Sequence, residues 1–360
     1  MIVYTLRRVI YAFVLLFFAA TAIFFIVYSV PGSPYDRIIR EIIENSPPNK
    51  LLSMSNFERL DNLLGLNQSV PIRYFYWIRN IFTGNFGESW SVVLGQPVFS
   101  VILKRIPYTL ILMFSAILLS LAVAVPAGLY SALRPYTDGD LILTAMSFFG
   151  MAMPSFWLGL LLISIFSNTL GWLPYTGVVS NDMPGDIITL IGRVLSLGLA
   201  NRQIAGQEGV ILIDGLKHLI LPTVTLSVVL ATRWSRFIRM SFLEVLHQDY
   251  IRAARAKGAS ERAIIFKHAL RNGFIPVITI MALDIPMLFT GSFVTEIVFG
   301  WPGIGRLYMN SISLVDWPLL HGLLIVNAFL IILANLIADI LYGIIDPRVK
   351  AIYLPAARPK

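Results

Sequence analysis

The sequence predicts an all-α, polytopic membrane protein with six transmembrane helices. Hydrophobic residues make up 57% of the 360 residues and charged residues only 13%, which is about half the charged fraction of a typical soluble chain. The apolar residues also gather in stretches long enough to cross a bilayer as helices, which takes about 20 residues each. Because backbone N–H and C=O groups inside lipid must pair within the protein, these stretches predict helices.

The six predicted spans follow one another along the whole chain. Three contain no Asp, Glu, Lys or Arg: Val9–Val30, Ile106–Leu133 and Leu141–Asn181. Three more are apolar but interrupted: Leu216–Met240, Gly273–Val298 and Trp317–Ile345. A β-barrel does not fit, because barrel strands alternate in polarity over about 10 residues and the first stretch is apolar throughout.

A cleaved signal peptide is the alternative interpretation of the first span, since Arg7 and Arg8 precede it. Its uncharged stretch exceeds the usual apolar run of about 7–15 residues, and no small-residue cleavage pattern follows it. The transmembrane interpretation is therefore favoured.

The distribution of charge predicts an orientation. With six spans, both termini, the 134–140 turn and the 233–272 segment share one side, which carries the whole net charge of +8. The other side carries no net charge. Because Lys and Arg remain on the cytoplasmic side, we expect both termini and the 233–272 segment inside. The basic composition then reflects topology, and no nucleic-acid partner is expected.

Four regions are expected along the chain. The segment 31–105 is expected to be a small extracytoplasmic elaboration, because prolines and glycines interrupt it. The full division is an N-terminal tail with the first helix over 1–30, the extracytoplasmic segment 31–105, a five-helix transmembrane domain 106–346 and a cytoplasmic tail 347–360.

Motifs for catalysis are absent from the sequence. No Gly-Lys pair exists to hold phosphates, and no Gly-x-Ser-x-Gly elbow occurs. The chain has no cysteine, and its four histidines do not have metal-ligand spacing: His218, His247, His268 and His321. We therefore expect neither an enzyme nor a metal or cofactor site in this chain.

Polar residues inside the spans are candidates for the substrate pathway, because a mid-bilayer carboxylate costs at least about 2.5–3.5 kcal/mol. The candidates are Asp284, Glu296 and Asn327. Asp284 could instead make a satisfied interhelical hydrogen bond, and Asp339 is expected to have a structural partner such as Arg348. Glu296 is expected where water can reach it. Prolines that can kink spans are also frequent: Pro107, Pro126, Pro154, Pro222, Pro276, Pro286 and Pro318.

The cytoplasmic segment 241–273 predicts a helix, a turn and a second helix. Asp249 can cap a short helix that starts at Tyr250, and Gly258 can end it in the left-handed conformation. Ser260, followed by Glu261, can cap the next helix.

Small residues on the first of these helices suggest a docking surface. Ala253, Ala254 and Ala256 leave the backbone bare beside Tyr250 and Ile251, so another protein could approach closely. The alternative is a basic loop held at anionic lipid by its cationic side chains: Arg252, Arg255, Lys257, Arg262, Lys267 and Arg271.

A family resemblance favours docking. Ala253-Ala254-x-x-x-Gly258 resembles the Glu-Ala-Ala-x-x-x-Gly signature of permease subunits of ATP-binding-cassette importers, although Arg252 replaces the Glu and Arg271 stands at a position where a proline is expected. The wider pattern resembles the dipeptide and oligopeptide permeases: Leu243–Leu246, Asp249–Gly258, His268–Asn272, Arg105–Leu110, Gly171–Pro174, His218–Pro222, Pro302–Gly305 and Asp346–Arg348.

The resemblance implies a type I importer permease fold with a coupling helix, in the cytoplasmic membrane of a prokaryote. It implies a second homologous permease, two ATPase subunits that carry the ATP and Mg, and an extracytoplasmic substrate-binding protein. The implied ATPase-docking residues are Glu244, Asp249, Tyr250, Ala253, Ala254, Ala256 and Gly258. Peptides are the expected substrate, and oligosaccharides, nickel complexes and glutathione are the alternatives. A stand-alone channel or intramembrane enzyme using Asp284 and Asp339 is the remote alternative.

Overall fold

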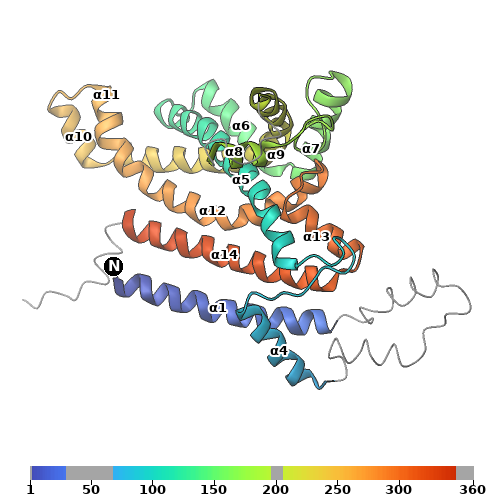
Figure 1. The fold of residues 1–360 in the computed structure, drawn as a ribbon. Coiled ribbons are helices and arrows are strands. Elements are labelled where there is room, and N and C mark those ends of the chain that lie inside the picture. The colour runs from blue at the N-terminus through green and yellow to red at the C-terminus, as the bar shows by residue number, and fades with distance from the viewer. Residues whose placement is uncertain (1, 30–67, 196–205, 346–360) are drawn as a thin grey trace, which may run out of the picture. The chain divides into compact units, whose positions relative to one another are not determined.

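A computed structural model describes residues 2–29, 68–195 and 206–345. Helices dominate these residues, and the β-structure among them is one isolated bridge between Glu88 and Pro97 (Figure 1). The predicted all-α fold class is confirmed.

Five helices are long and apolar enough to cross a membrane, and a sixth span is broken. The five are α1 (Ile2–Tyr28), α5 (Val98–Leu133), α9 (Glu208–Leu246), α12 (Leu270–Val298) and α14 (Trp317–Ile345). The remaining predicted span is a pair of helical segments bent by 103°. The first segment is α6 (Asp138–Ala152), and the second is α7 (Ser155–Leu162) continued by the π-helix η1 (Ile163–Thr169).

The bend lies at Met153 and Pro154. Met153 is extended, with φ −82° and ψ 123°, as expected for a residue that precedes proline. Pro154 then occupies the N-cap position of α7, without a side-chain hydrogen bond. The prediction of one span over Leu141–Asn181 is therefore wrong in detail, because the helix stops and restarts in a new direction.

Shorter helices connect the spans. They are α4 (Val70–Phe82), α8 (Ile187–Leu195), α10 (Asp249–Ala256), α11 (Glu261–Ala263), the π-helix η3 (Ile264–Ala269) and α13 (Ile304–Ser313). Figure 1 shows α10 and α11 at the end where α9 and α12 meet.

The chain divides into two compact units. The first contains residues 1–12, 106–306 and 331–360, and its core follows α9. Trp234, Ile238 and Phe242 are almost fully buried there. A Cβ added at Gly150 of α6 would lie 2.6 Å from Thr232, so α6 and α9 approach too closely for a larger residue.

The second unit contains residues 13–105 and 307–330. Thr21 of α1 and Tyr74 of α4 share a hydrogen bond of 2.7 Å. The carboxylate of Asp316 accepts hydrogen bonds from Ser89 Oγ at 2.5 Å and from the backbone N–H of Val92 at 3.0 Å. Residues 30–67 of the predicted extracytoplasmic segment lie outside the described residues, so the four-region division stays a prediction.

Candidate functional site

The loop between α9 and α12 packs as part of the first unit's core. Ile251 of α10 is fully buried, and it shares a hydrophobic cluster with Phe242 of α9 and Ile264 of η3. Phe242 also meets Phe274 of α12 edge to face, with ring centroids 5.6 Å apart. Burying such side chains contributes about 1.5–3 kcal/mol each. The loop is therefore tied to the two helices that carry it.

The turn after α10 has the predicted chemistry. Gly258 has φ +79°, in the left-handed region. Its N–H bonds the carbonyl of Arg255 at 2.9 Å. Ser260 Oγ accepts a hydrogen bond from the N–H of Ala263 at 3.3 Å, which caps α11. Both predictions are confirmed, and the second helix continues through η3 into α12.

The predicted cap at Asp249 is wrong by one position. Gln248 occupies the N-cap, and Asp249 is the first residue of α10. An acidic residue in the first turn still favours the helix, because it complements the positive end of the helix dipole.

Three polar contacts stabilise the loop and the ends of the two helices that flank it: one joins α10 to α12, one joins α9 to α12, and one lies within the loop. Asn272 Nδ2 donates to the hydroxyl of Tyr250 at 3.0 Å. Ser241 Oγ donates to the carbonyl of Gly273 at 2.7 Å. Arg255 Nε donates to Glu261 at 2.9 Å, although this pair is exposed and contributes little by itself. With the buried cluster, these contacts make α10 and the adjoining ends of α9 and α12 one mechanical unit.

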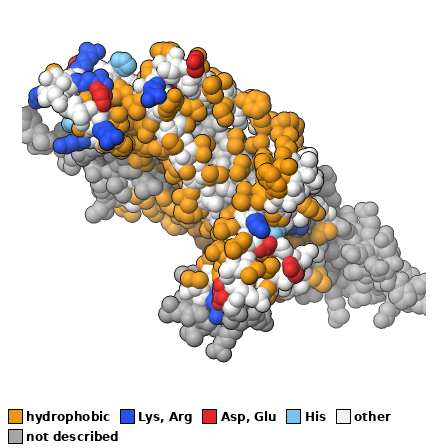
Figure 2. Space-filling view, turned by 90° about the horizontal axis from the view of Figure 1, so that it is seen from above, with side chains coloured by type: hydrophobic (Ala, Val, Ile, Leu, Met, Phe, Trp, Pro, Cys, Tyr) orange, Lys and Arg blue, Asp and Glu red, His pale blue; other side chains and the backbone are white. Residues whose placement is uncertain are grey.

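The side of α10 opposite Ile251 is exposed. Ala254 is half-buried and packs against the chain's own core, so it is less accessible than the other candidates. The exposed docking candidates are Glu244, Asp249, Tyr250, Ala253, Ala256 and Gly258. Figure 2 shows Lys and Arg side chains gathered at the end that holds α10 and α11, next to a predominantly hydrophobic face.

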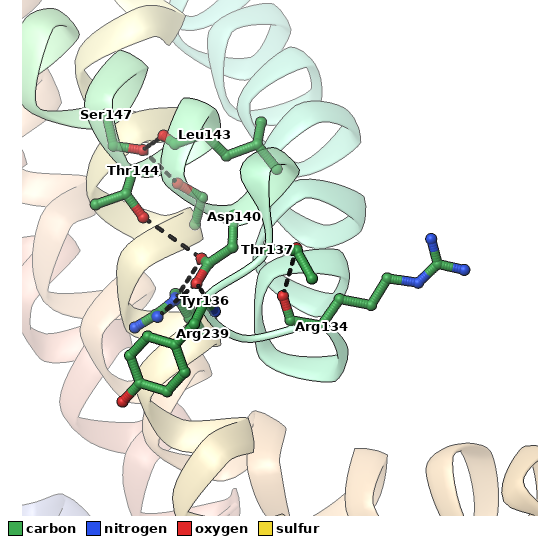
Figure 3. Close-up of polar contacts among 9 residues, drawn as sticks. Arg134, Tyr136, Thr137, Asp140, Leu143, Thr144, Ser147 and Arg239 are labelled. Carbon is green, nitrogen blue, oxygen red and sulfur yellow. Dashed lines mark hydrogen bonds and ion pairs between the residues drawn. The ribbon is translucent and has the colours of Figure 1, made fainter.

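An ion pair links the C-terminal end of α9 to the start of α6 (Figure 3). Arg239 donates through Nε and Nη2 to the two carboxylate oxygens of Asp140, each at 2.8 Å. Asp140 also accepts the N–H of Tyr136 at 2.9 Å, and its side chain is only 2% exposed. Because paired N–H···O bonds fix orientation as well as distance, α9 and α6 are joined directly where the loop begins.

Asp284 is buried on α12 and faces α9. Trp234 Nε1 donates to its Oδ2 at 2.9 Å. Arg233 Nη1 lies 3.0 Å from its Oδ1, although Oδ1 has no well-aligned hydrogen bond. Within this chain, Asp284 therefore makes the interhelical contact that the alternative interpretation predicted. Its place on a substrate pathway stays a prediction.

Glu296 is fully buried at the end of α12, so the expectation that water reaches it is wrong. Its carboxylate accepts from Thr109 Oγ1 at 2.7 Å and from the N–H of Gly305 at 2.6 Å. Thr109 Oγ1 in turn accepts the N–H of Ile304 at 2.9 Å. These contacts join the 105–110 and 302–305 sequence motifs around one carboxylate. A structural role accounts for this burial and bonding, and pathway lining stays a prediction.

The other two polar candidates have different surroundings. Asp339 pairs with Arg8, with Nη1 and Oδ2 3.0 Å apart. The expected partner, Arg348, lies outside the described residues. Asn327 is half-buried on α14 in the second unit, and its pathway role stays a prediction.

Sequence reasoning missed two groups of residues. Thr109 lies in the 105–110 motif, but nothing in that motif indicated its partner Glu296, which is 187 positions away. Arg233, Arg236 and Arg239 were visible as interruptions of an apolar span, and that signal could have marked them as paired or functional.

Six potential spans, a broken helix in the third and a packed loop between the fourth and fifth define a multi-pass membrane transport component. Two family models match the sequence and cover most of it. "Binding-protein-dependent transport system inner membrane component" matches residues 124–351, and the corresponding N-terminal component matches residues 1–113. The chain belongs to this family, whose fold is that of the type I importer permeases.

Similar proteins match along nearly their whole length. The oligopeptide transport system permease protein AppB of Bacillus subtilis is 36% identical over 97% of this chain and 100% of its own. The dipeptide permease DppB of Alkalihalophilus pseudofirmus is 34% identical over 97% of this chain and 100% of its own. The glutathione permease GsiC of Escherichia coli K12 is 32% identical over 97% of this chain and 99% of its own.

Proposed function

We propose that this chain is the permease subunit of an ATP-binding-cassette importer for di- or oligopeptides. It would form the translocation pathway with a second, homologous permease. Two ATPase subunits would bind ATP and Mg on the cytoplasmic side, and a substrate-binding protein would deliver peptide from outside. The chain itself would catalyse no covalent reaction and need no cofactor.

The packed loop is the observation that carries the proposal. Ile251 and its cluster hold α10 to α9 and α12, while the opposite face of α10 exposes Ala253, Ala256 and Tyr250. A partner that moved α10 would move both spans with it. Such coupling between two global arrangements is what alternating access requires.

The peptide substrate is supported by the relatives rather than by the loop. The oligopeptide and dipeptide permeases match the chain over 97% of its length, and so does the glutathione permease. Since glutathione is itself a small peptide, all three point to substrates that have amide bonds and free carboxylates. Glutathione is therefore retained as the second candidate.

The orientation follows from charge. The basic loop and both termini would lie in the cytoplasm, because Lys and Arg concentrate there. In this orientation, α10 faces the compartment that supplies ATP.

The docking proposal can be tested with one added carboxylate. Ala253→Glu places a charge on the exposed face of α10 and should reduce co-purification of the ATPase subunits at least tenfold, because an unpaired charge at a contact is costly. Thr137→Glu is the matched control. It adds the same charge to an exposed position in the 134–140 turn. Equal co-purification of both variants with the ATPases would refute docking through α10.

The substrate proposal needs transport by the complete complex. Proteoliposomes that contain both permeases and both ATPases, with the binding protein outside, should import labelled dipeptide or oligopeptide when ATP is inside. Import of glutathione with no import of other peptides would select the second candidate. ATP hydrolysis with import of neither would refute both.

A further inference from the structure

Two arginines lie on one exposed side of α9, within the span. Arg233 and Arg236 are three residues apart, and residues at this spacing are neighbours on a helix surface. Val229 and Met240 continue the same side and are exposed. Basic side chains inside a span are costly unless they are paired or face a polar path.

The two guanidinium groups have different surroundings. Arg233 Nη1 lies 3.0 Å from the buried carboxylate of Asp284, which balances its charge. Arg236 lies over the ring of Phe148, 4.3 Å from its centre, and its Nη1 lies 3.5 Å from Met151 Sδ. Among the residues that the structure describes, Arg236 has no carboxylate partner. Counting only the described residues, one positive charge on this side of α9 is therefore uncompensated.

In the proposed orientation, the guanidinium of Arg236 points from the cytoplasmic end of the predicted span toward its interior. α6 begins with Asp138 and carries Asp140 in its first turn, and Met151 lies three turns further along it, about 16 Å at 1.5 Å per residue. Arg236 extends toward Met151, because helical side chains tilt toward the N-terminus of their own helix. An arginine that served lipid phosphate at the cytoplasmic surface would extend the other way.

The broken span begins beside this group. Met151 is exposed next to the bend at Met153 and Pro154, and no side chain caps the N-terminus of α7. Uncapped N–H groups at a helix start carry partial positive charge and favour anions. Broken spans elsewhere in transporters place such half-helix ends against anionic substrate groups.

We propose that Arg236, with Arg233 beside it, receives the C-terminal carboxylate of a peptide as it crosses the membrane. One carboxylate would balance the one uncompensated guanidinium. Phe148 and Met151 would offer apolar contact to the adjoining side chain. The inference rests on the proposed peptide importer and names the substrate group that this chain recognises.

The test compares a peptide with its C-terminal amide in proteoliposomes that hold the complete complex. Uptake is measured for wild type and Arg236→Gln, with both peptides at concentrations that saturate the binding protein. The ratio of variant to wild-type uptake for each peptide removes the binding protein's own preference. We expect Arg236→Gln to lower uptake of the free acid about tenfold, as for loss of a hydrogen bond to a charged group, and to leave the amide unchanged.

Two further variants sharpen the test. Arg236→Lys keeps the charge and should retain most free-acid uptake. Arg134→Gln removes an exposed arginine at the end of α5 and should change neither peptide.

Three results would overturn the inference. Equal loss for the acid and the amide would indicate a structural role. Loss of assembly with the second permease would indicate that a partner carboxylate pairs with Arg236. Uptake of the free-acid peptide by wild type could depend on anionic lipid while uptake by Arg236→Gln did not. That result would indicate that Arg236 binds a lipid phosphate headgroup and not the peptide carboxylate. ATP hydrolysis by wild type without import of any peptide would instead refute the proposed function, and this inference with it.

Discussion

Arg239 and Asp140 form a two-bonded ion pair, with both N–H···O distances 2.8 Å, between the last turns of α9 and the first turn of α6. α9 leads directly into the loop that contains α10, and α6 leads to the bend at Pro154. The pair therefore connects the loop that would meet the ATPases with the helix that breaks inside the membrane. Motion of α10 would reach the broken span through this contact as well as through packing.

Replacing one partner of this ion pair should lower the stability of the fold more than replacing both partners. Arg239→Gln leaves the carboxylate of Asp140 buried without its cation, which costs about 3–5 kcal/mol. The double variant Asp140→Asn with Arg239→Gln should recover part of that loss. Thermal unfolding in detergent would measure the stability of the single and the double variant. Arg134→Gln is the control, because Arg134 points away from the pair (Figure 3). Additive losses in the double variant would show that the two residues are not coupled.

Substitutions of similar size at Gly258 should differ in their effect on ATPase binding. Its φ of +79° is tolerated by Asn far better than by a β-branched residue. No atom lies within 4 Å of a Cβ added there, so the effect would come from backbone strain. We expect Gly258→Asn to retain most ATPase binding and Gly258→Val to lose it, measured by co-purification. Equal binding by the two variants would mean that the left-handed turn does not set the position of α10.

Local chemistry explains which features the sequence predicted. The spans, the left-handed Gly258 and the Ser260 cap each depend on residues within a few positions of one another. The cap at Asp249 was misplaced by one residue, because Gln248 occupies the N-cap and Asp249 is already the first residue of α10. ATPase docking by these residues stays a prediction, since a single chain contains no partner.

Long-range pairing explains what the sequence did not predict. Seven prolines were equally able to kink a span, yet Pro126 and Pro222 lie inside continuous helices. Of the seven prolines, Pro154 is the one that follows a residue with extended backbone, Met153, and the helix breaks there. Similarly, Glu296 looked accessible near a helix end, and its burial depends on Thr109 and Gly305, which approach only when the chain has folded.

The carboxylate of Glu296 should make Gly303 intolerant of any side chain. A Cβ at Gly303 would lie 2.4 Å from the Glu296 carboxyl carbon, closer than any real contact. Gly303→Ala should therefore lower the unfolding temperature and the yield of folded protein. Gly291→Ala is the matched control, because its added Cβ would meet Leu226 at an ordinary 3.6 Å inside α12. If Gly303→Ala were as stable as Gly291→Ala, the Glu296 network would not be rigid.

Asp316 should make the second unit sensitive to acid. Burial by itself raises the pKa of this carboxyl. Hydrogen bonds from Ser89 and from the N–H groups of Ser91 and Val92 together lower the pKa by more than burial raises it, so the pKa lies below its ordinary value. Because the folded-state pKa is below the unfolded one, the stabilisation is complete above the unfolded pKa of about 3.9. It is lost as the pH falls through the folded value.

The comparison of wild type with Asp316→Asn tests this carboxylate. Near neutral pH, the variant should unfold at a lower temperature, because an amide cannot accept the same set of hydrogen bonds. Below about pH 4 the difference should shrink, because the carboxyl of the unfolded wild-type chain then takes up a proton, whereas the folded carboxylate does so only at lower pH. Asp182→Asn changes an exposed carboxylate and should show no such narrowing. A difference between wild type and Asp316→Asn that stayed constant from pH 7 to pH 3 would contradict the assigned role, since a charged acceptor is what the three donors require.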